Sequence, residues 1–140
     1  MQIHGVVPQA PFVGELPQEV TCVGIPTSAG VLTAAFIDEA VAGIAPEAES
    51  ASLVHEGPRA GDQPGSVPAL LVPGFTGSKE DFTPFLPYLA ERGRSACAYS
   101  QRGQADSAAP EGVENYRLAD FVGDLIEVAR AMGASERPIH

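Results

Sequence analysis

The chain is short and acidic. It has 140 residues, 18 acidic against 8 basic side chains, a formal charge of −10 and 44% hydrophobic residues. This length suits one small globular domain, and the negative charge argues against binding to nucleic acid or to anionic lipid head groups. Because no run of about 18 apolar residues could span a bilayer and residues 1–14 lack the pattern of a secretory signal, we expect a cytoplasmic protein.

The charge is unevenly distributed along the chain. Residues 1–66 carry eight acidic side chains and one basic side chain, whereas residues 67–140 carry ten and seven. Such asymmetry indicates that the two parts are organised differently, and it is typical of a solvated acidic face in the first. We expect residues 1–66 to supply amino-terminal strands and loops, and residues 67–140 to form the α/β core of the same domain.

The first part contains short apolar segments separated by turn-forming residues. Residues 20–25 and 31–37 flank a segment, residues 26–30, that contains Pro and Gly, and this pattern predicts a β-hairpin with a five-residue connection. A helix over residues 31–44 is the alternative, because alanine is frequent there. The Gly- and Pro-rich stretches that follow predict loops around a short strand at residues 52–55.

The pattern becomes clearer from residue 67 onward. The apolar run 67–73 predicts a strand buried on both faces. Ser78 is a candidate helix N-cap, with Asp81 at the third position of a capping box. A restart with Thr83 as the cap and Pro84 as the first helical residue is also predicted, and the helix then buries Phe85, Leu86 and Leu89 and ends at Gly93.

A second strand and a longer helix follow. Residues 95–99 predict a buried strand, and residues 100–107 a polar loop. Residues 115–132 predict a helix that ends at Gly133, because apolar side chains recur at steps of three and four at Leu118, Phe121, Val122, Leu125, Ala129 and Met132. Residues 137–140 begin a further strand, and the alternation of strands and helices predicts a parallel sheet.

The simplest catalytic and metal-binding motifs are absent from the sequence. There is no phosphate-binding loop and no H-E-x-x-H motif, and the histidines are far apart in the chain at positions 4, 55 and 140. We therefore expect no metal and no organic cofactor. Cys22 and Cys97 lack ligand spacing and are interpreted as buried thiols. There is no G-x-S-x-G motif either, and Cys97 occupies the second glycine position in the nearest approach, around Ser95.

The turn at residues 73–78, with the sequence PGFTGS, follows the first buried strand of the second part, and open α/β sheets place ligand sites at the carboxyl ends of strands. Three segments, in order, resemble the amino-terminal part of α/β-hydrolase-fold proteins. They are VPGFTGSKEDF at 72–82, LAERG at 89–93 and YSQRGQADS at 99–107. The first resembles the H-G-x-x-x-S oxyanion loop after strand 3 of that family, and the last its D-x-R-G-x-G-x-S loop after strand 4.

The resemblance implies a partial α/β-hydrolase fold, in which an amino-terminal β-hairpin or strands are followed by a parallel βαβαβ unit truncated at strand 5. It also implies that the backbone amide of Phe75 donates a hydrogen bond to the oxyanion of a tetrahedral intermediate. Gly74, Thr76 and Gly77 would support that loop. The alternative interpretation is that the two glycines only permit a tight turn between strand and helix.

The sequence departs from the family pattern at three positions. Pro73 replaces the usual His, Ser100 an Asp and Ala105 a Gly, while three residues match, at Arg102, Gly103 and Ser107. We expect these residues of the second loop to hold its shape and to have no catalytic role.

The family's G-x-S-x-G nucleophile, acid and base would follow the segment that begins at residues 137–140. The full-length parent is therefore expected to be a serine hydrolase acting on an ester, amide or related bond of a small molecule, and the 140-residue chain alone to be inactive. The alternative is a non-catalytic small α/β module for binding or interaction. The oligomeric state is not predicted.

Overall fold

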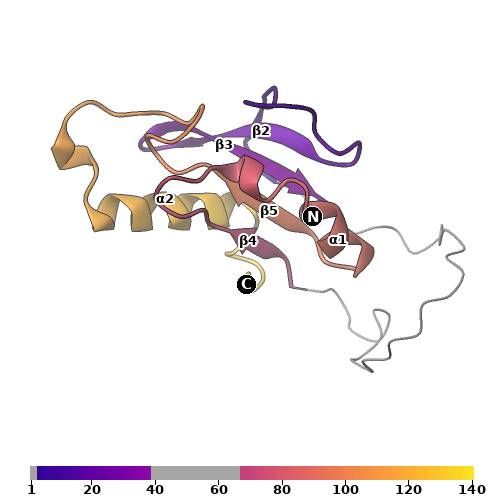
Figure 1. The fold of residues 1–140 in the computed structure, drawn as a ribbon. Coiled ribbons are helices and arrows are strands. Elements are labelled where there is room, and N and C mark those ends of the chain that lie inside the picture. The colour runs from indigo at the N-terminus through magenta and orange to yellow at the C-terminus, as the bar shows by residue number, and fades with distance from the viewer. Residues whose placement is uncertain (1–2, 39–66) are drawn as a thin grey trace, which may run out of the picture.

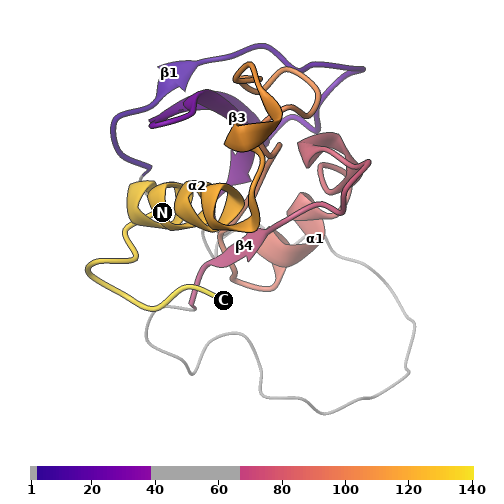
Figure 2. The same cartoon turned by 90° about the vertical axis from the view of Figure 1, so that its left-hand side faces the viewer.

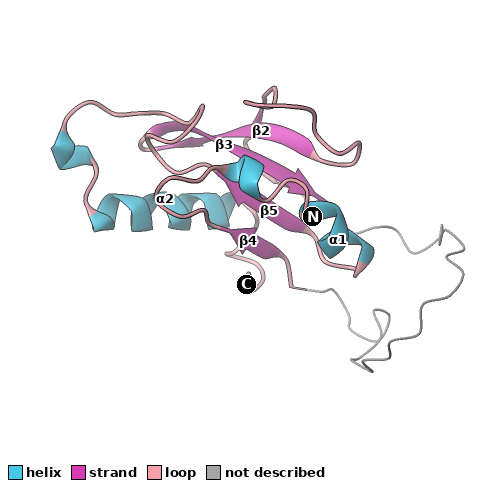
Figure 3. Ribbon diagram, viewed as in Figure 1, coloured by secondary structure: helices cyan, strands magenta, loops and turns pink. Residues whose placement is uncertain are grey.

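The computed structural model describes residues 3–38 and 67–140, which form a five-stranded mixed sheet with helices on both faces (Figures 1 and 3). The strand order is β1-β2-β3-β5-β4. The strands are β1 Val7–Pro8, β2 Thr21–Thr27, β3 Gly30–Ile37, β4 Ala69–Leu71 and β5 Ala96–Tyr99. The helices are α1 Leu86–Glu91, α2 Leu118–Ala131 and two 3₁₀ helices, η1 Lys79–Asp81 and η2 Val113–Asn115. The predicted strand at residues 52–55 and its flanking loops lie outside the described residues.

Strands β2 and β3 form the predicted hairpin. They pair antiparallel, with Thr27 opposite Gly30, so the connection has two residues, Ser28 and Ala29, instead of the five expected. The Thr27 hydroxyl donates to the Gly30 carbonyl at 2.8 Å and accepts the Ala29 N–H at 3.2 Å, which closes the turn and lets both strands extend further. The alternative helix is wrong for residues 31–37, which are β-strand.

Strands β4 and β5 are parallel, as predicted for the second part of the chain. Strand β5 lies between β4 and β3 and is buried throughout, whereas Leu70 and Leu71 of β4 are only half-buried. The expectation that residues 67–73 are buried on both faces is wrong for these two leucines, because β4 is the last strand of the described sheet order.

The backbone of His140 pairs with the outer edge of β4. Its N–H donates to the Pro68 carbonyl at 2.9 Å, and its carbonyl accepts the Leu70 N–H at 2.7 Å. This is the hydrogen-bond pattern of a parallel bridge. The segment at residues 137–140 thus begins to add a strand to the sheet, as the sequence predicts.

The two α-helices cover opposite faces of the sheet (Figure 2). On one face, Val128 of α2 and Met132, which follows the helix, pack against strand residues that include Ile25 and Leu32. On the other, Leu86 and Ala90 of α1 pack against a second set, Cys22, Ala35, Ile37 and Ala96. Because successive strand side chains point to opposite faces, β2, β3 and β5 each contribute to both layers of the core, whereas both residues of β1 are exposed.

The segment after β4 is less helical than predicted. Residues 79–81 form a single 3₁₀ turn with Ser78 as its N-cap and Asp81 at the third position, as predicted, and the Asp81 carboxylate accepts the Ser78 N–H at 3.0 Å. The predicted restart at Thr83 and Pro84 is wrong, because the Thr83 hydroxyl donates back to the Glu80 carbonyl and α1 begins only at Leu86.

The predicted apolar face of α1 is also only partly correct. Leu86 is buried and Leu89 is partly buried in the core, whereas Phe85 is exposed. Phe85 precedes the helix and stacks on Tyr88, another exposed ring, with 5.3 Å between the ring centroids. Gly93, at φ 71°, follows the end of the helix as predicted.

The longer helix is confirmed with a later start. Residues 113–115 form η2, so α2 begins at Leu118, and Gly133 follows its end at φ 90°. The predicted apolar face is wrong at Leu118 and Val122, which are exposed, because the helix instead turns Asp124 inward to meet an arginine. Neither this helix nor any other in the described part of the chain is long and apolar enough to cross a membrane.

Candidate functional site

The loop at residues 72–78 leaves the carboxyl end of β4 and turns back on itself. The Gly77 N–H donates to the Gly74 carbonyl at 3.0 Å. A side chain at Gly77 would collide with the Asp81 carboxylate and would lie 3.1 Å from the Pro73 side chain, whereas a side chain at Gly74 would meet nothing within 4 Å. A tight turn therefore explains the glycine at position 77, but local packing does not explain the glycine at position 74.

Phe75 lies at the exposed tip of this loop. The residue is 93% exposed, and its N–H has no hydrogen-bond acceptor among residues 3–38 and 67–140. Gly74 immediately precedes this amide, and the space that a side chain at Gly74 would occupy is open. The loop thus presents a free backbone donor, the chemical requirement for stabilising a developing oxyanion.

Two glutamines from the loop after β5 bind the carbonyl groups of this turn. Gln101 Nε2 donates to the Pro73 carbonyl at 2.8 Å. Gln104 Nε2 donates to the Gly74 carbonyl at 3.0 Å and to the Phe75 carbonyl at 2.7 Å. Sequence reasoning missed this contact, because the two loops are almost 30 residues apart. The signal that could have indicated this contact is the pair of side-chain amide donors in the motif QRGQ, Gln101 and Gln104.

The loop after β5 is itself anchored in the core. Arg102 Nε and Nη2 each lie 2.7 Å from an oxygen of Asp124, and Nη1 donates to the Asn115 carbonyl at 2.7 Å. The hydrogen bond to Asp124 raises the pKa of Arg102 above its ordinary value. Ser107 donates to the Ser100 carbonyl at 2.7 Å and accepts the Thr33 N–H at 2.9 Å. Arg102 and Ser107 thus hold the loop in shape, as expected.

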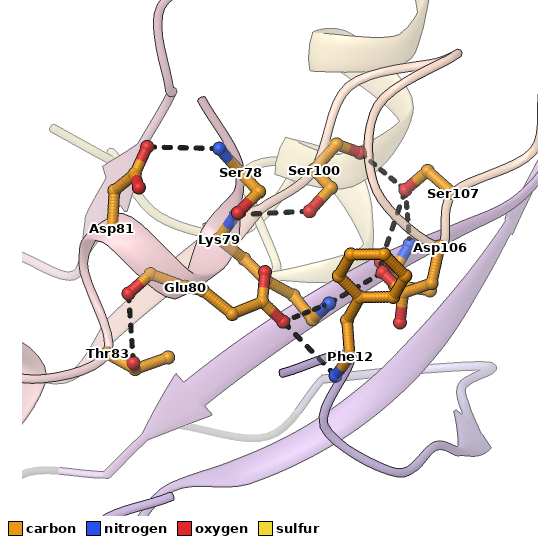
Figure 4. A network of polar contacts seen from close by, with 10 residues as sticks. Phe12, Ser78, Lys79, Glu80, Asp81, Thr83, Ser100, Asp106 and Ser107 are labelled. Carbon is orange, nitrogen blue, oxygen red and sulfur yellow. Dashed lines mark hydrogen bonds and ion pairs between the residues drawn. The ribbon is translucent and has the colours of Figure 1, made fainter. Parts of the chain in front are cut away.

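A buried lysine joins the two loops to β3 (Figure 4). The Lys79 side chain is fully buried, and its Nζ lies 2.7 Å from both Glu80 Oε1 and Asp106 Oδ1. Its backbone N–H donates to Ser100 Oγ at 3.0 Å, and the Thr33 hydroxyl donates to Asp106 Oδ1 at 2.5 Å. This burial cannot be predicted from the sequence, because Lys79 lies in the charged segment KED, which is typical of an exposed surface.

Lys79 favours the charged form of the Glu80 carboxylate. Burial raises the pKa of Glu80, but hydrogen bonds, chiefly from Lys79, outweigh it and hold that pKa below the ordinary value. The second carboxylate oxygen, Oε2, is buried and has no hydrogen-bond partner. The charge of Glu80 is therefore balanced mainly by Lys79, and these two residues depend on each other.

Two positions of the second loop have left-handed backbone conformations. Gly103 has φ 76°, and a side chain there would lie 2.8 Å from the ring of Tyr116. Ala105 has φ 48°, at the position where the family pattern has a glycine. The alanine therefore occupies a conformation that a side chain disfavours.

Within the described residues, no histidine side chain is hydrogen-bonded to the side chain of a serine, threonine or cysteine. The side chains of His4 and His140 make no hydrogen bond to any residue in 3–38 or 67–140, and His55 lies outside these ranges. Cys22 and Cys97 are both buried and free, as predicted. Burial raises the pKa of Cys97 to about 12, so this thiol stays protonated at neutral pH. The part of the chain that the structure describes also contains no group of three His, Cys, Asp or Glu residues arranged to hold a metal.

Comparison with known proteins gives structural similarity only. No protein-family model and no curated protein matches the sequence. An epoxide hydrolase from an endophytic Streptomyces matches 84% of this chain at 23% identity with a TM-score of 0.61. An epoxide hydrolase from Vigna radiata matches 86% of this chain at 20% identity with a TM-score of 0.60. An α/β hydrolase from Novosphingobium aromaticivorans matches 86% of this chain at 18% identity with a TM-score of 0.59.

The chain therefore has the α/β-hydrolase fold. It corresponds to 28%, 29% and 33% of the length of these three structures, so it contains one part of that fold. The mixed sheet agrees with the order expected from the sequence, an amino-terminal hairpin followed by parallel strands with helical connections.

Proposed function

We propose that this chain forms the oxyanion-loop part of a hydrolase that cleaves an ester, amide or related bond in a small molecule. The serine nucleophile, the acid and the base would be supplied by residues outside these 140. The observation that carries the proposal is the unbonded N–H of Phe75 on the loop that leaves the carboxyl end of β4. The fold adds support, since the solved structures of similar fold are named as hydrolases.

The Phe75 amide would act at the moment when charge develops. Attack on a carbonyl carbon places negative charge on the carbonyl oxygen, and a backbone N–H that is already fixed stabilises this charge without reorganising. One such donor contributes about two to three powers of ten in rate. In this proposal Gly77 keeps the turn compact, Gly74 leaves room beside the amide, and Thr76 continues the loop.

Epoxide opening is a second candidate reaction. It is favoured by the names of two similar structures, the epoxide hydrolases from Streptomyces and Vigna radiata. Opening an epoxide ring also creates a negatively charged oxygen that a backbone donor could stabilise. A non-catalytic binding module remains the alternative outside enzyme chemistry.

The test compares two polypeptides, the 140-residue chain and the product of the complete reading frame that contains it. We expect the complete product to hydrolyse p-nitrophenyl butyrate, and a serine-directed phosphonate to label a serine outside residues 1–140. Turnover of a fluorogenic epoxide without phosphonate labelling would instead favour epoxide opening. Turnover by the 140-residue chain that the phosphonate abolishes would contradict the placement of the nucleophile, and no turnover by the complete product would favour the binding module.

A further inference from the structure

We propose that Gln104, assisted by Gln101, is a positioning residue that orients the Phe75 N–H toward the reacting oxygen. This inference rests on the proposed function of the loop. It starts from a residue at a position that the family motif leaves unspecified, since Gln104 Nε2 contacts two successive carbonyl groups of the turn, those of Gly74 and Phe75.

The argument follows from the planarity of the peptide group. The Gly74 carbonyl and the Phe75 N–H belong to one peptide unit, and in a trans unit these two groups point in opposite directions. A hydrogen bond from Gln104 to the Gly74 carbonyl therefore directs the Phe75 N–H away from the loop after β5. The bonds to the Phe75 and Pro73 carbonyls fix the peptide units on either side in the same way.

This external support matters because the turn is weakly restrained at Gly74. Glycine lacks the side chain that limits backbone rotation, and no atom would contact a side chain at this position within 4 Å. The Gly77 N–H also binds the Gly74 carbonyl, but it comes from the same turn and can move with it. Gln104 instead ties the peptide unit to a different loop, which the Arg102 ion pair anchors to α2.

The side-chain amide of Gln104 has one consistent orientation. Its Oε1 accepts the backbone N–H of Gln101 at 3.2 Å, which leaves Nε2 facing the turn. The reverse orientation would place Oε1 against the carbonyl oxygens of Gly74 and Phe75, and Nε2 against an N–H. The donor role of Gln104 toward the turn is thus fixed by the partners on both sides of the amide.

The test uses Gln104→Glu, which preserves the size of the side chain. One carboxylate oxygen can still accept the Gln101 N–H, but the other faces two carbonyl oxygens and repels them. In ¹³C,¹⁵N-labelled protein we expect changed shifts for the Gly74 carbonyl carbon and the Phe75 amide, with the β5 resonances unchanged. In the complete gene product, kcat for p-nitrophenyl butyrate should fall about a hundredfold with little change in KM. Gln18→Glu, the same change at an exposed glutamine, should alter neither measurement.

The possible results separate this inference from the proposed function. Unchanged Gly74 and Phe75 shifts in Gln104→Glu would overturn the positioning role, whatever the activity. Changed shifts with full activity would instead overturn the oxyanion role of Phe75, on which the inference rests. If the variant does not fold, long-range HNCO spectra of the unsubstituted chain should show couplings from Gln104 Nε2 to the Gly74 and Phe75 carbonyl carbons. The absence of these couplings would also overturn the inference.

Discussion

Arg102 and Asp124 form a buried two-point ion pair that joins the loop after β5 to helix α2. Arg102 Nε and Nη2 lie 2.7 Å from Oδ2 and Oδ1 of Asp124, and both side chains are almost fully buried. The paired geometry of guanidinium and carboxylate fixes direction as well as distance. Since the same loop carries Gln101 and Gln104, this ion pair supports the contacts that hold the candidate oxyanion turn.

Removing the charge of Asp124 should destabilise the fold strongly. Asp124→Asn leaves the Arg102 guanidinium buried without its counter-ion, and breaking such a pair costs about 3–5 kcal/mol. The free energy of unfolding, measured by urea denaturation, checks this value. Glu111→Gln removes an exposed carboxylate and should change stability by less than about 0.5 kcal/mol. If the two substitutions changed the free energy of unfolding equally, the ion pair would not stabilise the fold.

The stability of the fold should decrease in acid, in part through Glu80. The pKa of Glu80 is lowered in the folded chain, so its contribution is fully present above the unfolded value, near 4.5, and is lost as the pH falls through the lower folded value. Glu80→Gln should therefore reduce the free energy of unfolding at pH 7. The difference in this free energy between the variant and the unsubstituted chain should become smaller as the pH falls below about 4.5. Thermal unfolding at several pH values measures the difference. A constant difference from pH 7 to pH 2 would rule out the coupling to Lys79.

The two cysteines should be unreactive in the folded chain. Burial raises the pKa of both thiols, that of Cys97 to about 12, and the thiolate is the reactive form. We expect Ellman's reagent to modify Cys22 and Cys97 only at the rate of unfolding, and both to react at once in 6 M guanidinium chloride. Rapid modification of Cys97 in the native chain at pH 8 would contradict the observed packing of β5.

Relieving the backbone of Ala105 should stabilise the chain slightly. A left-handed conformation costs a residue with a side chain about 1–2 kcal/mol, while the greater freedom of glycine in the unfolded chain offsets about 0.4–1 kcal/mol of any gain. Ala105→Gly should thus raise the free energy of unfolding by about 0.5 kcal/mol. The matched change Ala109→Gly, at a position with negative φ, should lower it. A loss of stability in both variants would contradict the strain at Ala105.

The parts of the fold that the sequence predicts are those with strong local patterns. The apolar segments of the hairpin, the buried strand β5 and the glycines that end α1 and α2 all depend on residues close together in the chain. Periodicity predicts the wrong burial for Leu118 and Val122 of α2, because the burial of Asp124 depends on Arg102, which is 22 residues away in the chain. Hydrophobic periodicity cannot show that a carboxylate is buried by a distant partner.

The candidate site shows the same limit. The resemblance located the turn at residues 73–78, and it also named Phe75 as the candidate donor. The support for that turn, from Gln101, Gln104 and Lys79, could not be inferred, because each contact joins separate loops and depends on how β4 and β5 pair. The direction of the Phe75 amide is thus a tertiary property of the fold.

The most direct test of the proposed function removes the Phe75 N–H by an amide-to-ester change, which also weakens the Gly74 carbonyl as an acceptor. Replacing Phe75 with phenyllactic acid, by nonsense suppression in the complete gene product, changes the amide to an ester and retains the side chain. If this N–H stabilises the oxyanion, kcat/KM for p-nitrophenyl butyrate should fall about a hundredfold to a thousandfold. The same change at Ala109 weakens the Ala108 carbonyl, which accepts the Gly103 N–H at 2.8 Å, and should have little effect on kcat/KM. Full activity of the Phe75 ester would contradict the account.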